Sequence, residues 1–291
     1  MKKLFFLFAA AAMIFPLAFS CTKEDKPTNV EMEPAKTADV AKVVSFEKAT
    51  GTNPTYTKAG KTYEILSIEF TEGSRYILRR KPLLANSLTK ADDAVEVVTG
   101  TFTESNGKYT CQGEFTGTVE PKGTSADVTP QGGQTQSAPA NVQDTNTTTK
   151  EATNASRTWK VDNSYIKVSG KGINIDTGFN GLDFVSIADY AMNAGVNINP
   201  ANFMGYSCTE VLFTGEGSMV ISFSGAPSFY GTYRLSGENL SYTFLSGGND
   251  IMGQSANGTL TFPADHKAEL TLNTTIKGYT GSIQLSMSEI Q

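Results

Sequence analysis

The sequence predicts an all-β, antiparallel protein: a C-terminal eight-stranded up-and-down barrel with one helix, preceded by a smaller β-rich region. Three observations predict this class. Charged residues make up only 18% of the 291 residues, while Gly (27), Tyr (11) and Phe (17) are plentiful, a mixture typical of short strands joined by tight turns. Apolar and polar residues alternate with period two through the C-terminal half. The turns between those runs are short, and short turns join antiparallel neighbours.

The first twenty residues have the layout of a secretory signal peptide. Lys2 and Lys3 supply a positive start, and the run Leu4–Phe19 that follows carries no charge. That run is about sixteen residues long, whereas a membrane-spanning helix needs about twenty. We therefore expect residues 1–20 to be a cleaved signal peptide rather than a retained membrane helix.

A cysteine follows the apolar run directly. The stretch Leu17–Cys21 resembles the lipobox of bacterial lipoproteins, which implies that the Cys21 thiol is lipidated and becomes the first mature residue. Lys23, Glu24 and Asp25 resemble the surface-export signal of lipoproteins in Bacteroidota. The resemblance implies a protein held in outer-membrane lipid through Cys21 and displayed on the cell surface. The alternatives are a periplasm-facing anchor and a secreted protein with an unmodified cysteine.

Two segments follow the expected lipidation site. Residues 21–42 are polar and contain two prolines, so we expect a tether without a fold of its own. Residues 43–122 predict a β-rich N-terminal domain containing two hairpins. The strongest turn signal there is the Asn106-Gly107 pair, which is flanked by strand-like sequence.

Residues 123–156 differ from their surroundings in composition. Thr, Gln, Asn, Ser and Pro dominate, and Val128 and Val142 are the only large apolar residues. Such a segment buries too little apolar surface to offset the entropy lost on ordering. A long structureless insertion inside a compact domain is uncommon. We therefore predict a disordered linker that precedes a C-terminal domain over residues 157–291.

Alternating strands predict the barrel in this C-terminal domain. Polar residues, mostly Ser, Thr, Glu and Gln, stand between the apolar ones, which is typical of strands with one buried and one solvated face. Closing eight such strands into a barrel removes the exposed edges. The expected strands are 159–168, 207–214, 218–224, 230–236, 240–245, 257–262, 267–273 and 280–290.

One helix is expected between the first two of these strands. Residues 181–195 carry apolar side chains at helical spacing, Asp183 suits the N-terminal end, and Gly195 suits a left-handed C-terminal cap. Such a helix can cover one end of the barrel. The positions expected on its apolar face are Leu182, Val185, Ile187, Ala188, Ala191 and Met192.

Residues 157–291 resemble the lipocalin-like domains of lipoproteins from gut Bacteroidota. Arg157-Thr158-Trp159 stands where lipocalins have a Gly-x-Trp turn, so this chain keeps the tryptophan and lacks the glycine. The resemblance implies a lipocalin-like barrel in which the Trp159 ring plugs one end, with Arg157 close by.

The two halves of the chain also resemble each other. Residues 68–78 (IEFTEGSRYIL) are similar to residues 211–221 (VLFTGEGSMVI), and residues 100–110 are similar to residues 231–243. Either the chain contains a repeated four-strand unit, or antiparallel hairpins simply look alike.

Two cysteines remain besides Cys21, one in each half of the chain. Outside the cytoplasm Cys111 and Cys208 can form a disulfide, which requires the halves to touch. The alternative is a pair of buried thiols that behave as small apolar side chains.

No constellation of residues in the sequence predicts catalysis. With 24 basic and 29 acidic residues the chain has a net charge of −5, which provides no electrostatic footprint for nucleic acid. The single histidine, His266, lies in a predicted turn, and alone it does not build a usual zinc site. Phosphate-binding and dinucleotide-binding motifs are missing from the sequence. We therefore expect no enzyme, no metal and no cofactor.

Two groups of side chains remain as candidates for binding. Residues 75–81 contain three arginines and a lysine, which form either a solvated strand end or a site for an anionic ligand or lipid headgroup. Aromatic side chains near strand ends and the helix can stack on sugars or line an apolar pocket. The aromatic candidates are Trp159, Tyr190, Tyr206, Tyr230 and Tyr233.

The expected function is therefore non-catalytic binding by a membrane-anchored lipoprotein. Its ligand would be a small apolar or amphipathic molecule, or a glycan. The alternative is an accessory subunit that binds an outer-membrane protein and whose barrel is filled by its own side chains.

Overall fold

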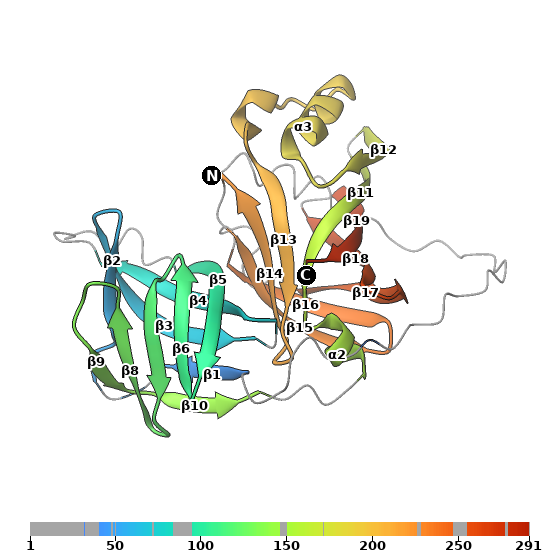
Figure 1. The fold of residues 1–291 in the computed structure, drawn as a ribbon. Helices are drawn as coiled ribbons and strands as arrows, with labels where there is room; N and C mark the ends of the chain where they lie inside the picture. Colours follow the sequence, from blue (N-terminus) through green and yellow to red (C-terminus); the bar gives the residue numbers. More distant parts are fainter. Residues whose placement is uncertain are drawn as a thin grey trace. The chain divides into compact units, whose positions relative to one another are not determined.

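The computed structural model describes residues 32, 41–47, 49, 51–71, 73–83, 95–145, 150–170, 172–225, 228–246, 255–276 and 279–290. The expected signal peptide, the lipidation residue Cys21 and the export residues Lys23, Glu24 and Asp25 lie outside these residues. The protein is all-β and antiparallel, and its chain forms two compact units (Figure 1). Of the described residues, the N-terminal unit contains those within 34–149, and the C-terminal unit contains Met32 and nearly all of those within 150–291.

The C-terminal unit contains a closed barrel of eight antiparallel strands, as the sequence predicts. Successive strands pair from β13 to β19, and β11 pairs with both β13 and β19, which closes the ring. All eight predicted strands are confirmed, with ends that differ by three residues at most. The strands are β11 (Thr158–Gly170), β13 (Ser207–Phe213), β14 (Ser218–Ser224), β15 (Phe229–Ser236), β16 (Asn239–Ser246), β17 (Ser255–Ala264), β18 (Lys267–Ile276) and β19 (Tyr279–Glu289).

Apolar side chains of the protein itself fill this barrel. One cluster of buried residues joins the inward side chains of all eight strands with the helix at one end. Within it Trp159, Phe213, Phe262 and Leu270 are each 0% exposed. A void large enough for water would leave accessible surface on the side chains that line it. Their full burial therefore indicates close packing around these residues.

The predicted helix is confirmed as α3 (Phe184–Asn193). It begins after Asp183, whose carboxylate accepts the N–H of Ser186 at 3.0 Å, and Gly195 follows its end with a φ of 90°. The helix buries Phe184, Ile187, Ala188 and Ala191 against the barrel cluster. Met192 is a correction: it is 45% exposed, because it lies on the edge of the apolar face and points away from the barrel.

One strand of the C-terminal unit was not predicted. β12 (Ile173–Asn180) pairs with the outer half of β11 and lies outside the closed ring. Its sequence, INIDTGFN, alternates Ile173, Ile175 and Phe179 with polar residues, but its Asn, Asp and Gly residues are depleted in strands and hid the pattern. A short 3₁₀ helix, η2 (Pro200–Phe203), is the last element of the connection between β11 and β13.

The N-terminal unit is a ten-stranded antiparallel sheet that closes on itself. Its order runs β10, β1, then β3 to β9, with β2 paired to β3. Because Ala140 alone separates the two end strands β9 and β10, the sheet has to roll until its ends meet. The strands are β1 (Lys42–Ser45), β2 (Thr55–Lys58), β3 (Lys61–Phe70), β4 (Arg75–Leu83), β5 (Glu96–Ser105), β6 (Lys108–Gly113), β7 (Gly117–Pro121), β8 (Ser125–Pro130), β9 (Gln136–Pro139) and β10 (Asn141–Asp144).

The linker prediction for residues 123–156 is therefore wrong. Three strands, β8, β9 and β10, belong to the N-terminal sheet, and α2 (Lys150–Ala155) belongs to the C-terminal unit. Few apolar residues suffice because each strand adds only one or two side chains to a core built mostly by others. Ala126 and Val128 are 0% exposed and Ala138 is 3% exposed. Backbone pairing supplies the rest and does not depend on composition.

The two barrels share one pairing scheme. Following paired residues from strand to strand assigns each position in one barrel a counterpart in the other, and β9 with β10 takes the place of β19. In both barrels, following the paired residues once around the ring leads back to the starting residue, so the two rings close with the same stagger between strands. The matched positions are Val44 and Trp159, Phe70 and Phe213, Tyr76 and Met219, Gly100 and Gly231, Phe102 and Tyr233, Val128 and Leu272, Gln136 and Ile283, and Val142 and Glu289.

Local geometry repeats as well. The second strand of each ring, β3 or β13, carries a β-bulge at the matched position. The rings of Phe70 and Phe102 meet edge-on with centroids 5.1 Å apart, and so do those of Phe213 and Tyr233. Common registers and a common bulge favour a true internal repeat over a chance likeness of hairpins, and the repeating unit is the whole ring.

Cys111 and Cys208 are free thiols in different units. Burial raises the pKa of the Cys111 thiol to about 12. An unfolded chain loses that proton near pH 8.5. Stability from the protonated thiol is thus fully present at neutral pH and declines as pH rises toward 12.

We expect the free energy of unfolding of the N-terminal barrel, measured by urea titration, to fall between pH 8.5 and 11, by up to about 1.4 kcal/mol per pH unit for this thiol. Buried tyrosines add to the decline above pH 10. In the Cys111→Ala variant the decline should be shallower, whatever the variant's stability at pH 7. Equal slopes for the two proteins would contradict the burial of this thiol.

Candidate functional site

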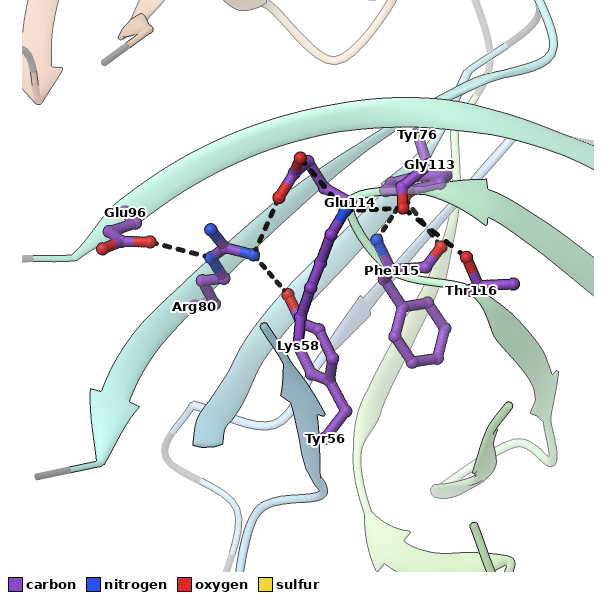
Figure 2. Close-up of polar contacts among 9 residues, drawn as sticks. All are labelled: Tyr56, Lys58, Tyr76, Arg80, Glu96, Gly113, Glu114, Phe115 and Thr116. Carbon is purple, nitrogen blue, oxygen red and sulfur yellow. Dashed lines mark hydrogen bonds and ion pairs between the residues drawn. The ribbon is translucent and has the colours of Figure 1, made fainter. Parts of the chain in front are cut away.

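A charged cluster lies on the inner face of the N-terminal barrel, centred on Arg80 of β4 (Figure 2). Its guanidinium donates from Nε to Glu96 at 2.9 Å, and from Nη1 to Tyr56 Oη at 2.6 Å and to Glu114 at 3.3 Å. Lys58 on β2 adds a second cation, 3.1 Å from the other Glu114 oxygen. The Arg80 guanidinium also stacks on the ring of Tyr63, 3.9 Å from its centroid.

In this cluster two cations, Arg80 and Lys58, face two carboxylates, Glu96 and Glu114. Burial opposes the charge of Arg80, whose side chain is 8% exposed, but the bonds with Tyr56 and Glu96 hold the pKa of the guanidinium above its usual value. Burial likewise raises the pKa of Tyr56 to about 12. Because Arg80 and Lys58 are matched by Glu96 and Glu114, the cluster carries no net charge to attract an anion.

The basic segment 75–81 is therefore not one patch. Alternation along β4 sends Arg80 inward, whereas Arg79 pairs with Glu47. The matched position to Arg80 in the C-terminal barrel is Phe223, so the two copies differ here in chemistry. Neither the solvated strand end nor the anion site expected from sequence describes Arg80.

Three of the five predicted aromatic candidates are buried, and two of them, Trp159 and Tyr233, belong to the barrel's apolar cluster. Trp159 is 0% exposed and donates from Nε1 to the carbonyl of Ala155 at 3.2 Å. Tyr233 packs edge-on against Phe213 inside the barrel, and Tyr230, also on β15, is 9% exposed. Rings buried in this way offer no flat surface to a ligand.

The other two candidates lie at the α3 end of the barrel. Tyr206 is half-buried and meets Phe203 edge-on. Tyr190 projects from α3, is 40% exposed, and meets Phe179 of β12 edge-on with centroids 6.1 Å apart. Tyr190 is thus the predicted residue whose ring is most open to solvent.

A second exposed ring lies near enough to Tyr190 to interact with it electrostatically. This ring belongs to Tyr165 on β11, which is also 40% exposed. Its hydroxyl donates to Asp176 of β12 at 2.5 Å, and this bond raises the pKa of Tyr165. Lys167 lies 3.9 Å from Asp176 and 5.5 Å from the centroid of the Tyr165 ring. We call Tyr165, Lys167, Asp176 and Tyr190 the tyrosine face; Phe179 supports Tyr190 from the core side of β12.

Sequence reasoning missed most of this face because β12 was not recognised. Without β12, Asp176 and Phe179 have no place beside β11. Comparison of the two barrels would have pointed to this region, because their connections between the first and second ring strands differ. Among the described residues, that connection holds β2 in the N-terminal barrel, whereas it holds β12, α3 and η2 in the C-terminal barrel. Elaborated connections on a rigid scaffold are where binding residues concentrate.

The single histidine takes part in a structural contact. His266 Nδ1 lies 2.7 Å from Glu289, and both oxygens of that carboxylate accept from Arg157 Nη1, at 2.8 and 2.7 Å. These bonds link the β17–β18 turn to the seam between β11 and β19. Across the residues with described positions, no group of three His, Cys, Asp or Glu side chains is placed to hold a metal.

Comparison with models of known protein families and with the curated proteins finds no match to this chain. In the described part of the chain, no helix has the length and apolar character needed to cross a membrane.

Proposed function

We propose that this protein is a lipoprotein anchored through Cys21 in the outer membrane, facing the cell surface, and that it binds a glycan without catalysis. The observation that carries the binding role is the tyrosine face: two tyrosine rings, each 40% exposed and near enough to interact electrostatically, with an ion-paired carboxylate beside Tyr165. The sequence around Cys21 supports the anchor by its likeness to a lipobox and export signal.

The chemistry of the tyrosine face suits a sugar. A sugar ring has an apolar C–H face that packs on an aromatic ring, and a rim of hydroxyls that need hydrogen-bond partners. Tyr165 and Tyr190 offer ring surface, while Asp176 and Lys167 offer an acceptor and a donor next to it. A small apolar ligand would instead need an enclosed apolar pocket, and the fully buried barrel side chains already occupy that space.

Affinity electrophoresis through gels that contain soluble polysaccharides tests the binding role. We expect at least one polysaccharide to retard the wild-type protein, and Tyr190→Ala to weaken that retardation at least about tenfold, as loss of a central aromatic contact does. Leu245→Ala is the matched control, because Leu245 lies on the same barrel and is 44% exposed. Unchanged retardation of Tyr190→Ala would refute the site.

Replacement of the lipidation residue tests the anchor separately. Cys21→Ala is expected to abolish fatty-acid labelling and to release the protein from the membrane fraction, since acyl chains contribute about 0.8 kcal/mol per buried methylene. Cys208→Ala serves as the control and should label normally. Fatty acid incorporated into Cys21→Ala would count against lipidation at this residue.

A second candidate function is an accessory subunit of an outer-membrane complex. Met192 and Met204, at the α3 end, are 45% and 73% exposed, and methionine is enriched at protein interfaces. Co-purification of an outer-membrane protein with the wild type, but not with Met204→Asp, would favour this candidate over glycan binding.

A further inference from the structure

One residue of the expected tether is part of the C-terminal barrel's core. Met32 is 3% exposed and belongs to the same apolar cluster as Trp159. Its backbone N–H donates to Oδ1 of Asn154 at 3.0 Å, and Asn154, on α2, is itself 1% exposed. Met32 thus packs its side chain in the core and hydrogen-bonds a buried polar side chain through its backbone, and we call this arrangement docking. The N-terminal barrel, over residues 34–149, is thus inserted between Met32 and α2.

Helix α2, which carries Asn154, lies at the opposite end of the C-terminal barrel from α3 and β12, which carry Tyr190 and Asp176 (Figure 1). Strand β13 shows this directly. Its first residue, Ser207, pairs with Asp183 at the start of α3, while the N–H of its last residue, Phe213, donates to the carbonyl of Arg157, just after α2. A strand of seven residues separates these ends, which corresponds to about 20 Å.

We propose that Met32 orients the anchored protein: its docking at the α2 end turns that end toward the membrane and points the tyrosine face outward. The proposal rests on the lipidation of Cys21 and the binding role of the tyrosine face proposed above. Met32 lies eleven residues after Cys21, and a chain of that length reaches at most about 40 Å. The anchor therefore limits the α2 end to that distance from the lipid surface, while the α3 end, about 20 Å farther along the barrel, can extend beyond it toward a ligand.

Hydrogen exchange on the full chain, without lipid, tests the docking by itself. The Met32 amide is expected to be protected, and Asn154→Ala should speed its exchange about tenfold, because the buried acceptor is removed. Asn202→Ala, at an exposed position on η2, should leave that amide unchanged. A Met32 amide that exchanges at the unprotected rate in the wild type would overturn the docking.

Energy transfer to the membrane tests the orientation. A donor dye is placed at Lys160→Cys, near the α2 end, or at Met192→Cys on α3, with Cys111 and Cys208 replaced by alanine. The acylated chain is bound to phosphatidylethanolamine–phosphatidylglycerol vesicles that carry an acceptor lipid. Transfer should be stronger from position 160 than from position 192, and Met32→Asp should abolish the difference.

The outcomes separate the proposals. Equal transfer from the two positions in the wild type, or stronger transfer from position 192, refutes the orientation while leaving the anchor intact. Vesicles that capture no protein refute the anchor, and the orientation with it, while hydrogen exchange still decides whether Met32 docks. Glycan binding in solution depends on neither result.

Discussion

Replacement of Trp159 by alanine is expected to lower the free energy of unfolding of the C-terminal barrel by about 3–5 kcal/mol, the usual cost of removing a large aromatic side chain from a core. The ring is 0% exposed, lies with its centroid 6.1 Å from that of Phe262, and donates from Nε1 to Ala155 at 3.2 Å. Its loss would leave a cavity beside α2 that neighbours on several strands cannot close. The measurement is the urea midpoint, followed by circular dichroism.

Fluorescence of the unmodified protein checks the same burial before any mutation. Trp159 is the only tryptophan, so all tryptophan emission reports on this ring. We expect blue-shifted emission that acrylamide quenches poorly. Trp159→Phe is the matched variant: it keeps an aromatic ring and loses the N–H together with part of the indole, so it should cost much less than alanine. Red-shifted, readily quenched emission would contradict a core position and return Trp159 to the ligand candidates.

Tyr76→Phe is expected to destabilise the N-terminal barrel by about 2–4 kcal/mol, although it removes a single oxygen, because buried polar groups left without a partner cost about 1–3 kcal/mol each. The Tyr76 hydroxyl donates to the carbonyl of Phe115 at 2.9 Å and accepts the N–H of Phe115 at 2.7 Å (Figure 2). Burial raises the pKa of Tyr76 and keeps the hydroxyl protonated as a donor. The variant therefore leaves two backbone groups unpaired.

The chain contains a matched control for this change. Tyr109 is also 0% exposed, and its ring stacks on Phe70 with centroids 3.9 Å apart, but no hydrogen bond joins its hydroxyl to the residues around it that the structure describes. Tyr109→Phe should shift stability by less than about 1 kcal/mol. Equal urea midpoints for the two variants would show that the contact between Tyr76 and Phe115 contributes little.

Gly100 shows how such a contact depends on a distant residue. A Cβ on Gly100 would lie 2.3 Å from the ring of Tyr76, so only glycine lets the ring cross β5 and reach Phe115. The matched glycine in the other barrel, Gly231, lies equally close to its neighbour: a Cβ there would lie 2.4 Å from the carbonyl oxygen of Thr243. The sequence contains both glycines in the similar hairpins, but the reason for them is visible only across strands.

The sequence by itself determined the class of fold and the C-terminal elements. Period-two alternation is a local property that survives in each strand, so all eight ring strands could be predicted, and α3 could be placed from its apolar spacing, Asp183 and Gly195. The tether and the lipidation site around Cys21 remain predictions. Catalysis, a metal and a cofactor were not expected from the residue types present.

Tertiary structure decided the rest, because the deciding contacts join residues that are far apart in the chain. Strands β8 to β10 lack apolar character of their own and are held by a core that other strands build, so their composition resembled a linker. β12 is a strand because it pairs with β11, and this pairing brings Asp176 to Tyr165. Arg80 is the centre of a buried group of ion pairs, and Met32 is a core residue. In both cases the partners lie far away in the sequence, so the local sequence does not reveal them. Alternation sets which way a side chain points; only the closed rings decide what it meets there.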